Sequence, residues 1–511
     1  MKNKILFATG FLWVSSVLII VYMPNIVSAI YFGVSTLLFA LTLYDVLQQK
    51  HSLLRNYPLL ARLRWTFEAE RDKIKQYFIE SDLDGTPINR EKRSIVYQRS
   101  KKQIETIPFG TQHNVYEKGY EFVKHSLFPK DHHHIGGDRV EFGSVHCKQK
   151  YSTSLINISA MSFGSLSKAA IMALNQGAKL GNFAHNTGEG GISPYHLQGG
   201  DLIFQIGTGY FGAGITNENG VRIFDADCFE KNATRPEVKM VEIKLSQGAK
   251  PGHGGILPAK KNTEEIAKIR GVEPFTRVDS PPGHSAFSTY VGLIDFIQTV
   301  REKSGGKPVG IKFCVGNPDE IEEMIKTFAQ EGNYPDFISV DGSEGGTGSA
   351  PLEFTNYMGT PLLEGLAHIV KLLKKYNLRS EIKIIASGKV VDAFDMVKLL
   401  ALGADTLNIA RSFMLSLGCI QARECNTDTC PVGVATQNPK LVKALVVEKK
   451  NERVKNYHEK TIDSLKEMIG AMGLENINML EPKYVYKRLK NDKIYTYQDL
   501  YYTEKIFADQ F

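Results

Sequence analysis

Eight short apolar runs occupy the middle of the chain, and glycine, serine, asparagine or aspartate residues lie at or near their C-terminal ends. In order they are LINISAMS (155–162), GNFAHNTG (181–188), MVEIKLSQG (240–248), TRVDSPPG (276–283), VGIKFCVG (309–316), DFISVDGS (336–343), IKIIASGK (382–389) and DTLNIARS (405–412). Helix-like segments follow many of them, and continuous apolar strands that alternate with helices are typical of a parallel sheet covered on both faces. Eight such units predict an α/β fold, a (β/α)8 TIM barrel with its chemistry at the C-terminal ends of the strands.

A doubly wound sheet is the alternative fold, but no GxGxxG motif opens the first unit. Between the second and third runs, LIFQIGTGYFG (202–212) and VRIFDADCF (221–229) are interpreted as an inserted hairpin. The amphipathic stretch 440–479 is expected to be a closing helix.

The loops after the last three runs are rich in glycine. They are DGSEGGTGSAP (341–351), ASGK (386–389) and NIARSF (408–413). Loops after the late strands of barrels commonly bind phosphate through backbone N–H groups and helix N-termini. These glycines could instead only form turns, but three consecutive strand ends agree. The residues predicted to hold the phosphate end of a cofactor are Gly345, Gly346, Gly348, Ser387, Gly388 and Arg411.

Small and polar residues end the earlier runs, as is needed where a flat ring lies against the backbone. The candidates for cofactor contact are Ser159, Met161, Ser162, Asn186 and Thr187. Lys312 ends the fifth run, and a lysine beside the N1/C2 edge of a flavin stabilises its reduced, anionic form. Lys244, Gln247 and Lys250 follow the third run, where basic groups could also hold a dicarboxylate. The alternative is that these lysines are ordinary surface residues.

Three of the six cysteines lie within one stretch, CIQARECNTDTCPVGVAT, at Cys419, Cys425 and Cys430. Their spacing differs from the paired Cys-x2-Cys of structural zinc sites. Thiolates are the usual ligands of iron–sulfur clusters, and a proline after a ligating cysteine recurs in ferredoxins. Three ligands suit a 3Fe–4S cluster, whereas a 4Fe–4S cluster needs a fourth, which only a remote residue such as Cys314 could supply. On spacing alone, zinc remains open.

The N-terminus contains two uncharged apolar runs, residues 5–23 and 26–44, separated by Pro24 and Asn25. Each is just long enough to span a bilayer core of about 30 Å as a helix. Basic residues precede and follow the pair, which by the positive-inside tendency places both ends in the cytoplasm. We expect a transmembrane helical hairpin that anchors the chain in the inner (cytoplasmic) membrane with its catalytic domain in the cytoplasm. A cleaved signal peptide is the alternative, but no small-residue cleavage site precedes Pro24.

The composition adds limits on partners and compartment. The net charge of +7 is modest for 511 residues, and no basic block interleaved with aromatic residues indicates a nucleic-acid surface. Six cysteines argue against a disulfide scaffold and for a reducing compartment, where clustered thiols more often bind metal.

Five motifs together resemble the central, FMN-binding region of the glutamate synthase large subunit. They are SAMSFGSLS, NTGEGG, QGAKPGHGG, GGTGSAP and C-x5-C-x4-CPVGVATQ, and the resemblance runs from about residue 105 to 437. It implies an FMN-binding barrel, a 3Fe–4S cluster on the three cysteines, and 2-oxoglutarate bound over the flavin. The residues it places toward substrate or flavin are Lys244, Gln247, Lys250 and Arg270, with Arg270 as the carboxylate clamp. Glu189, at the end of the second run, is a further catalytic candidate.

The chain departs from that family in several ways. We expect neither an amidotransferase domain, nor a C-terminal β-helical domain, nor a nicotinamide-binding site. Ammonia must then be free or come from a separate glutaminase subunit. In QGAKPGHGGI, His253 and Ile256 stand where the family usually has Glu and Gln. These two changes put the identity of the 2-oxo acid in question.

The resulting hypothesis is a glutamate synthase-like oxidoreductase. Electrons from a donor protein or reductase subunit pass through the cluster to FMN, which reduces an imine formed from 2-oxoglutarate, or a related 2-oxo acid, and ammonia. One alternative is an FMN and iron–sulfur oxidoreductase or amine-forming transferase with another substrate. Another is a membrane-anchored electron-transfer subunit. The predicted domains are a hairpin (1–48), a connecting and capping region (49–150), the barrel with its iron–sulfur loop (151–440), and a closing helix with a tail (441–511).

Overall fold

In the computed structural model, which describes residues 1–103, 106–490 and 493–503, the chain forms two compact units, Met1–Gly85 and Thr86–Phe511. The first unit consists of helices α1 (Lys2–Tyr22), α2 (Ile26–Leu47), α3 (Ser52–Asn56) and α4 (Arg62–Ile74), and a one-turn π-helix (Lys75–Ile79). The division into four domains expected from the sequence stays a prediction.

Helices α1 and α2 form the predicted antiparallel hairpin. Asn25 caps α2 and forms a capping box with Ser28, which explains the sharp turn between the helices. The hairpin is polar inside and apolar outside: Ser16 Oγ and Ser35 Oγ lie 2.5 Å apart between the helices. The exposed side chains include Phe7, Phe11, Leu18 and Ile30. Both helices are long and apolar enough to cross a membrane, and this arrangement is compatible with lipid surroundings.

The second unit is built on a closed barrel of eight parallel strands, which confirms the predicted fold class. Around the barrel the strands are ordered β4, β5, β6, β9, β12, β13, β14 and β15. Their bounds are β4 Ile156–Ile158, β5 His185–Asn186, β6 Leu202–Ile206, β9 Val238–Lys244, β12 Val309–Phe313, β13 Phe337–Asp341, β14 Lys383–Ser387 and β15 Thr406–Ile409.

One of the eight predicted strands is wrong. The run 276–283 contains only β11 (Val278–Asp279), which pairs antiparallel with β10 (Ile256–Leu257) outside the barrel. The third barrel strand is instead β6, which was interpreted as part of an inserted hairpin. All five residues of β6 are buried, whereas the run 276–283 is mostly exposed or half-buried and carries two prolines. The remainder of that insertion does form a hairpin, β7 (Gly214–Thr216) with β8 (Arg222–Phe224).

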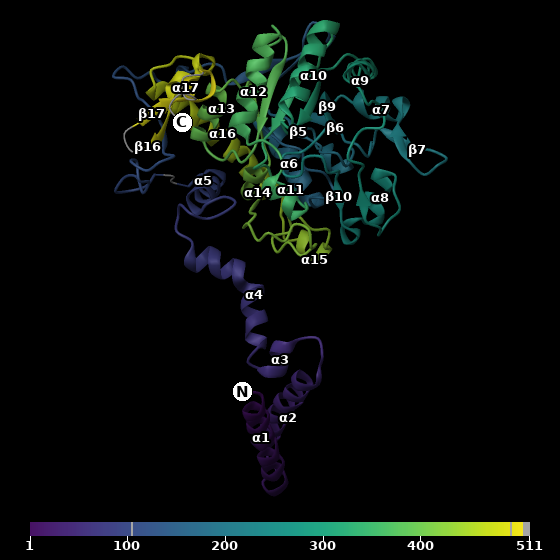
Figure 1. The fold of residues 1–511 in the computed structure, drawn as a ribbon, viewed down its shortest axis with the longest axis vertical. Helices are drawn as coiled ribbons and strands as arrows, with labels where there is room; N and C mark the ends of the chain where they lie inside the picture. Colours follow the sequence, from purple (N-terminus) through teal and green to yellow (C-terminus); the bar gives the residue numbers. More distant parts are fainter. Residues whose placement is uncertain (104–105, 491–492, 504–511) are drawn as a thin grey trace. The chain divides into compact units, whose positions relative to one another are not determined.

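Helices surround the barrel strands (Figure 1). They are α6 Lys168–Gly181, α7 Ala226–Ala233, α8 Glu264–Arg270, α9 Tyr290–Lys303, α10 Pro318–Glu331, α11 Leu352–Tyr357, α12 Leu362–Lys375, α13 Ala393–Ala401 and α14 Arg411–Leu417. Most of them bury one apolar face against the sheet, as amphipathic helices of barrels do.

The segments that flank the barrel pack on its outside. Within the stretch 440–479, which was expected to be a closing helix, the structure has α16 (Val447–Ala471), which lies against α6 and α5 (Arg90–Lys101) and buries Tyr457, Leu465 and Ile469. The remaining elements are β1 Glu121–Val123, β2 Arg139–Phe142, β3 Tyr151–Ser154, α15 Pro439–Val442, β16 Val485–Lys490, β17 Lys493–Thr496 and α17 Tyr497–Tyr501. Strand β1 pairs with β16, so the segment before the barrel is tied to the segment after it.

Candidate active site

A cavity of about 560 Å³ opens at the C-terminal ends of the barrel strands. It is lined by the loops after most strands and by the cysteine-rich loop. Most of the residues predicted from the sequence lie in its wall. They are Ser159, Met161, Ser162, Glu189, Lys244, Gln247, Lys250, Arg270, Lys312, Gly345, Gly346, Gly348, Ser387, Gly388, Arg411, Cys419, Cys425 and Cys430.

Asn186 and Thr187 lie below this wall, in the buried interior of the barrel. The Asn186 amide donates to Glu242 Oε1 at 2.7 Å, and Gln205 Nε2 donates to the same oxygen at 2.6 Å. Ser339 donates to the other carboxylate oxygen of Glu242, and the Thr187 hydroxyl accepts from the backbone N–H of Gln205 at 3.1 Å. Asn186 and Thr187 therefore support Gln205, which does line the cavity, instead of facing the cavity themselves.

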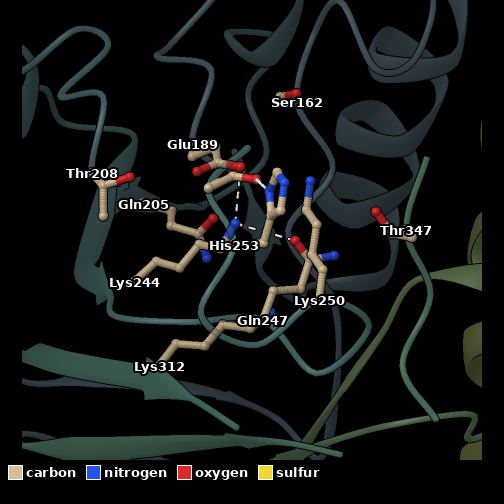
Figure 2. A network of polar contacts seen from close by, with 12 residues as sticks. Ser162, Glu189, Gln205, Thr208, Lys244, Gln247, Lys250, His253, Lys312 and Thr347 are labelled. Carbon is tan, nitrogen blue, oxygen red and sulfur yellow. Dashed lines mark hydrogen bonds and ion pairs between the residues drawn. The ribbon is translucent and has the colours of Figure 1, made fainter. Parts of the chain in front are cut away.

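Lys244, at the end of β9, is the centre of a polar cluster (Figure 2). Its Nζ donates to Glu189 Oε1 at 2.9 Å and to Gln247 Oε1 at 3.2 Å. Burial alone would raise the pKa of Glu189, but the adjacent Lys244 ammonium, with Lys250 and Arg270 nearby, lowers it below its usual range. Glu189 is therefore an ionised carboxylate among several cations. Its side chain is 18% exposed, so it remains open to the cavity.

Two further cations, Lys250 and Arg270, lie near Glu189. Arg270, in the last turn of α8, donates to Ser162 Oγ and to the Phe163 carbonyl, both at 3.2 Å. Its Nε has no hydrogen-bond partner among the described residues, and burial lowers its pKa to about 10. Lys250 donates to the Ser349 carbonyl at 3.1 Å, and burial together with Lys244 lowers its pKa to about 8. Both groups carry donor capacity that an anionic ligand could use.

The glycine-rich loops line another part of the same cavity. A Cβ on Gly346 would lie 3.0 Å from Arg411 Nε, and one on Gly348 would lie 3.2 Å from Ser165 Oγ. Arg411 donates to the Glu344 carbonyl at 2.6 Å, which holds its guanidinium beside the loop. A side chain at either glycine would therefore press on Arg411 or Ser165, and glycine lets both groups lie close to the loop.

Lys312 in β12 and Asn408 in β15 also line the cavity. The Lys312 ammonium is 3.5 Å from Asp341 Oδ2, and burial, which alone would lower its pKa, is outweighed by Asp341 and Glu242, so the pKa is raised. Asn408 Oδ1 is buried and has no hydrogen-bond partner among the described residues. A buried acceptor without a partner costs free energy, which a donor from a bound ligand would recover.

The three clustered cysteines are free thiols and line one part of the cavity. Burial raises the pKa of Cys419 to about 12, and the other two sulfurs add to that shift. Burial and Cys430 also raise the pKa of Cys425. Cys314 lies elsewhere: its Sγ is 3.8 Å from the carbonyls of Val315 and Thr360.

Lys261 connects the cysteine loop to the rest of the cavity. It is 2% exposed, and its ammonium donates to three carbonyls, those of Ser165 at 2.5 Å, Cys425 at 3.2 Å and Ala435 at 3.3 Å. The loop after the first barrel strand is thus held against the cysteine loop at two points.

Sequence reasoning missed Gln205, Lys261 and Asn408 as cavity residues. Gln205 lies in β6, which was not interpreted as a barrel strand; its buried LIFQI pattern was the available signal. Asn408 was within a predicted loop motif but was not selected. Lys261 follows another lysine in a polar segment, and the sequence carries no signal that distinguishes a buried lysine from an exposed one.

The chain matches the family model described as a conserved region in glutamate synthase over residues 103–475. It belongs to the glutamate synthase family. It is 38% identical over 486 residues to the glutamate synthase large subunit-like protein YerD of Bacillus subtilis, which covers 87% of this chain and 91% of YerD. This chain is accordingly a glutamate synthase-like oxidoreductase.

More distant relatives are matched over less of their length. The archaeal glutamate synthase [NADPH] of Methanocaldococcus jannaschii is 34% identical over 64% of this chain and 60% of its own length. The glutamate synthase [NADPH] large chain of Bacillus subtilis is 31% identical over 62% of this chain and 20% of its own length. The chain therefore spans only part of these relatives.

Proposed function

We propose that the cavity binds FMN, with the phosphate in the glycine-rich part and the ring over the barrel floor. The glycine loops line the cavity without side chains, and Arg411 adds a guanidinium beside them. Asn408 Oδ1 accepts a hydrogen bond from the ligand, and the Lys312 ammonium is available to an anionic reduced ring. When bound, FMN would supply hydride transfer.

The cysteine loop holds a 3Fe–4S cluster in this proposal. Three thiols line one cavity wall. The raised pKa values of Cys419 and Cys425 mean that the protein alone keeps these two thiols neutral, so a bound metal must displace their protons. The contacts of Cys314 at Val315 and Thr360 favour three ligands over four. Zinc is the competing occupant. The cluster would supply one-electron transfer.

The reaction proposed is reduction of the imine formed from 2-oxoglutarate, or a related 2-oxo acid, and ammonia. Lys250 and Arg270 bind the carboxylates of the substrate, since both are enclosed cations with donors directed at the cavity. The Lys244 ammonium, which donates to Glu189 Oε1, carries a proton that can move to the substrate nitrogen, and the ionised Glu189 carboxylate can accept a proton from it. Gln247, which accepts from Lys244 and donates to the Gly346 carbonyl at 2.9 Å, fixes the lysine between the two parts of the cavity.

The observation that carries the proposal is that the glycine loops, the Lys244 cluster and the three cysteines all line one continuous cavity. This arrangement argues against a subunit that only transfers electrons, because such a subunit has no need of an enclosed cluster of substrate-binding cations.

A related oxidoreductase or amine-forming transferase with another substrate is the second candidate. Ile256 lines the cavity close to Leu257 and Val278, and His253 packs edge-on to Phe354 with ring centroids 5.4 Å apart. An apolar Ile256 cannot hydrogen-bond a carboxylate. The substrate can therefore be a 2-oxo acid whose side chain is less polar than that of 2-oxoglutarate.

The remaining parts of the proposal concern location and partners. The hairpin anchors the chain in the cytoplasmic membrane, with the barrel in the cytoplasm, and a donor protein or reductase subunit supplies electrons. Ammonia is free or delivered by a separate glutaminase subunit. No nucleic acid takes part.

The test is turnover by the full chain in detergent, with ammonium, a chemically reduced viologen and a panel of 2-oxo acids. Formation of glutamate supports the first candidate. Formation of a different amino acid in preference to glutamate supports the second, and no amino acid from any 2-oxo acid, by a protein that contains flavin, contradicts both.

A further inference from the structure

Helix α4 (Arg62–Ile74) and the π-helical turn after it expose an apolar face. Leu63 and Phe67, four residues apart and therefore on one side of the helix, are 53% and 61% exposed. Phe78 in the π turn is 85% exposed, and Ile79 is 70% exposed. Such a row of large apolar side chains on a solvated helix indicates that another surface covers it.

The start of this helix is fixed to the end of the second apolar helix. Asp45, in the last turn of α2, is buried and accepts from the Leu59 backbone N–H at 3.0 Å and from Arg62 Nε at 3.0 Å. Arg62 Nη2 donates to the other oxygen of Asp45 at 2.5 Å, and this pairing raises the pKa of Arg62. The first residue of α4 is thereby held within hydrogen-bond distance of the end of α2.

The segment also carries the charge of a membrane-surface element. Residues 50–79 contain seven Lys and Arg against three Asp and Glu. Arg64, Arg71 and Lys75 follow one another at the spacing of a second helical stripe, beside the apolar one. Amphipathic helices with this combination lie in the bilayer interface, and anionic headgroups attract the basic side chains.

We propose that α4 and the π turn lie in the membrane interface, with Leu63, Phe67 and Phe78 at the boundary between headgroups and acyl chains of an anionic bilayer. This rests on the proposed membrane anchoring. Two observations favour a lipid surface over a second copy of the chain. The Asp45–Arg62 contact holds the first residue of α4 at the end of the apolar helix α2, and basic residues lie beside the apolar row.

Single-tryptophan fluorescence of the full chain tests the inference. The chain has two tryptophans, Trp13 in α1 and Trp65 in α4. In a Trp13→Phe, Trp65→Phe background, Phe67→Trp places the probe on the apolar face, and Leu63→Trp repeats that measurement. Glu68→Trp is the matched control on the polar side of the same turn. Each protein is reconstituted into vesicles of phosphatidylcholine and phosphatidylglycerol that carry brominated acyl chains.

We expect Phe67→Trp and Leu63→Trp to be quenched by lipid brominated near the headgroups and shielded from acrylamide, and Glu68→Trp to show the reverse. Equal acrylamide quenching at all three positions overturns the inference. Shielding of Phe67→Trp from acrylamide without quenching by brominated lipid also overturns it, since a protein surface would then cover the face.

The anchor itself has a separate readout. In the Trp65→Phe protein, native Trp13 reports the hairpin alone. Quenching of Trp13 by deeply brominated lipid with no quenching of Phe67→Trp refutes only the interfacial helix, whereas an unquenched Trp13 refutes the membrane anchor on which it rests.

Discussion

Replacing Glu189 by glutamine separates the electrostatic role of this side chain from its shape. The carboxylate accepts from Lys244 at 2.9 Å and lies near Lys250 and Arg270. Loss of one partner costs about 3–5 kcal/mol in a fully buried ion pair and about 0–1 kcal/mol in an exposed one. Because Glu189 is open to the cavity, we expect Glu189→Gln to lower the free energy of unfolding by about 2 kcal/mol.

The same change should strengthen the binding of anions. Glu189 repels a substrate carboxylate held by Lys250 and Arg270, and at an effective dielectric constant of about 20 a unit charge about 5 Å away contributes about 3 kcal/mol before screening by solvent. We therefore expect 2-oxoglutarate to bind the flavin-loaded Glu189→Gln variant at least about tenfold more tightly, which corresponds to 1.4 kcal/mol.

Denaturant unfolding measures the first effect and isothermal titration calorimetry the second. Glu218→Gln is the matched control, since it removes the same charge from an exposed position in the turn between β7 and β8. A variant as stable as the parent that binds 2-oxoglutarate more weakly would refute the electrostatic reasoning.

Three further predictions concern packing and pH. Gly248→Ala places a Cβ against the Gly342 carbonyl oxygen, so it should lower the free energy of unfolding by about 3 kcal/mol and remove most of the bound flavin. Gly316 has open space around it, so Gly316→Ala should change neither the stability nor the flavin content. Burial lowers the pKa of His458 to about 3, so between pH 6.5 and pH 3 the imidazole binds a proton only in the unfolded chain. The free energy of unfolding therefore falls as the pH falls below 6.5, by about 2 kcal/mol at pH 5. In urea titrations, His458→Phe should abolish this part of the pH dependence. Lys250, with a pKa of about 8, loses its charge as the pH rises through 8, so the affinity for a 2-oxo acid should fall between pH 7 and 9 in the parent but not in Lys250→Met.

Much of the fold and of the site follows from local sequence, because a parallel barrel places its functional residues at strand ends. The apolar runs predicted seven strands, and the residues at their ends predicted the glycine loops and the lysines, whereas the cysteines stood out by their own clustering and spacing. The error at β6 has a physical cause: LIFQI is short and is followed by Gly207, Gly209 and Gly212, a pattern shared by hairpins.

Side-chain direction was the second limit. Strand β5 has only two residues, so its alternation cannot be read from a pattern, and Asn186 faces Glu242 inside the barrel instead of the cavity. Burial of a charged residue was the third limit, as Lys261 shows. Its burial depends on carbonyls from Ser165, Cys425 and Ala435, which are brought together only by the tertiary fold.

The central claim is that sulfur ligands and a flavin site share one cavity, and metal and flavin content test it most directly. Full-length protein purified anaerobically in detergent should contain FMN and about three irons per chain, with the electron paramagnetic resonance signal of an oxidised 3Fe–4S cluster. Cys425→Ser should lose the iron and the signal while it keeps FMN. Parent protein that contains FMN but binds zinc or no metal at the three cysteines would contradict the account.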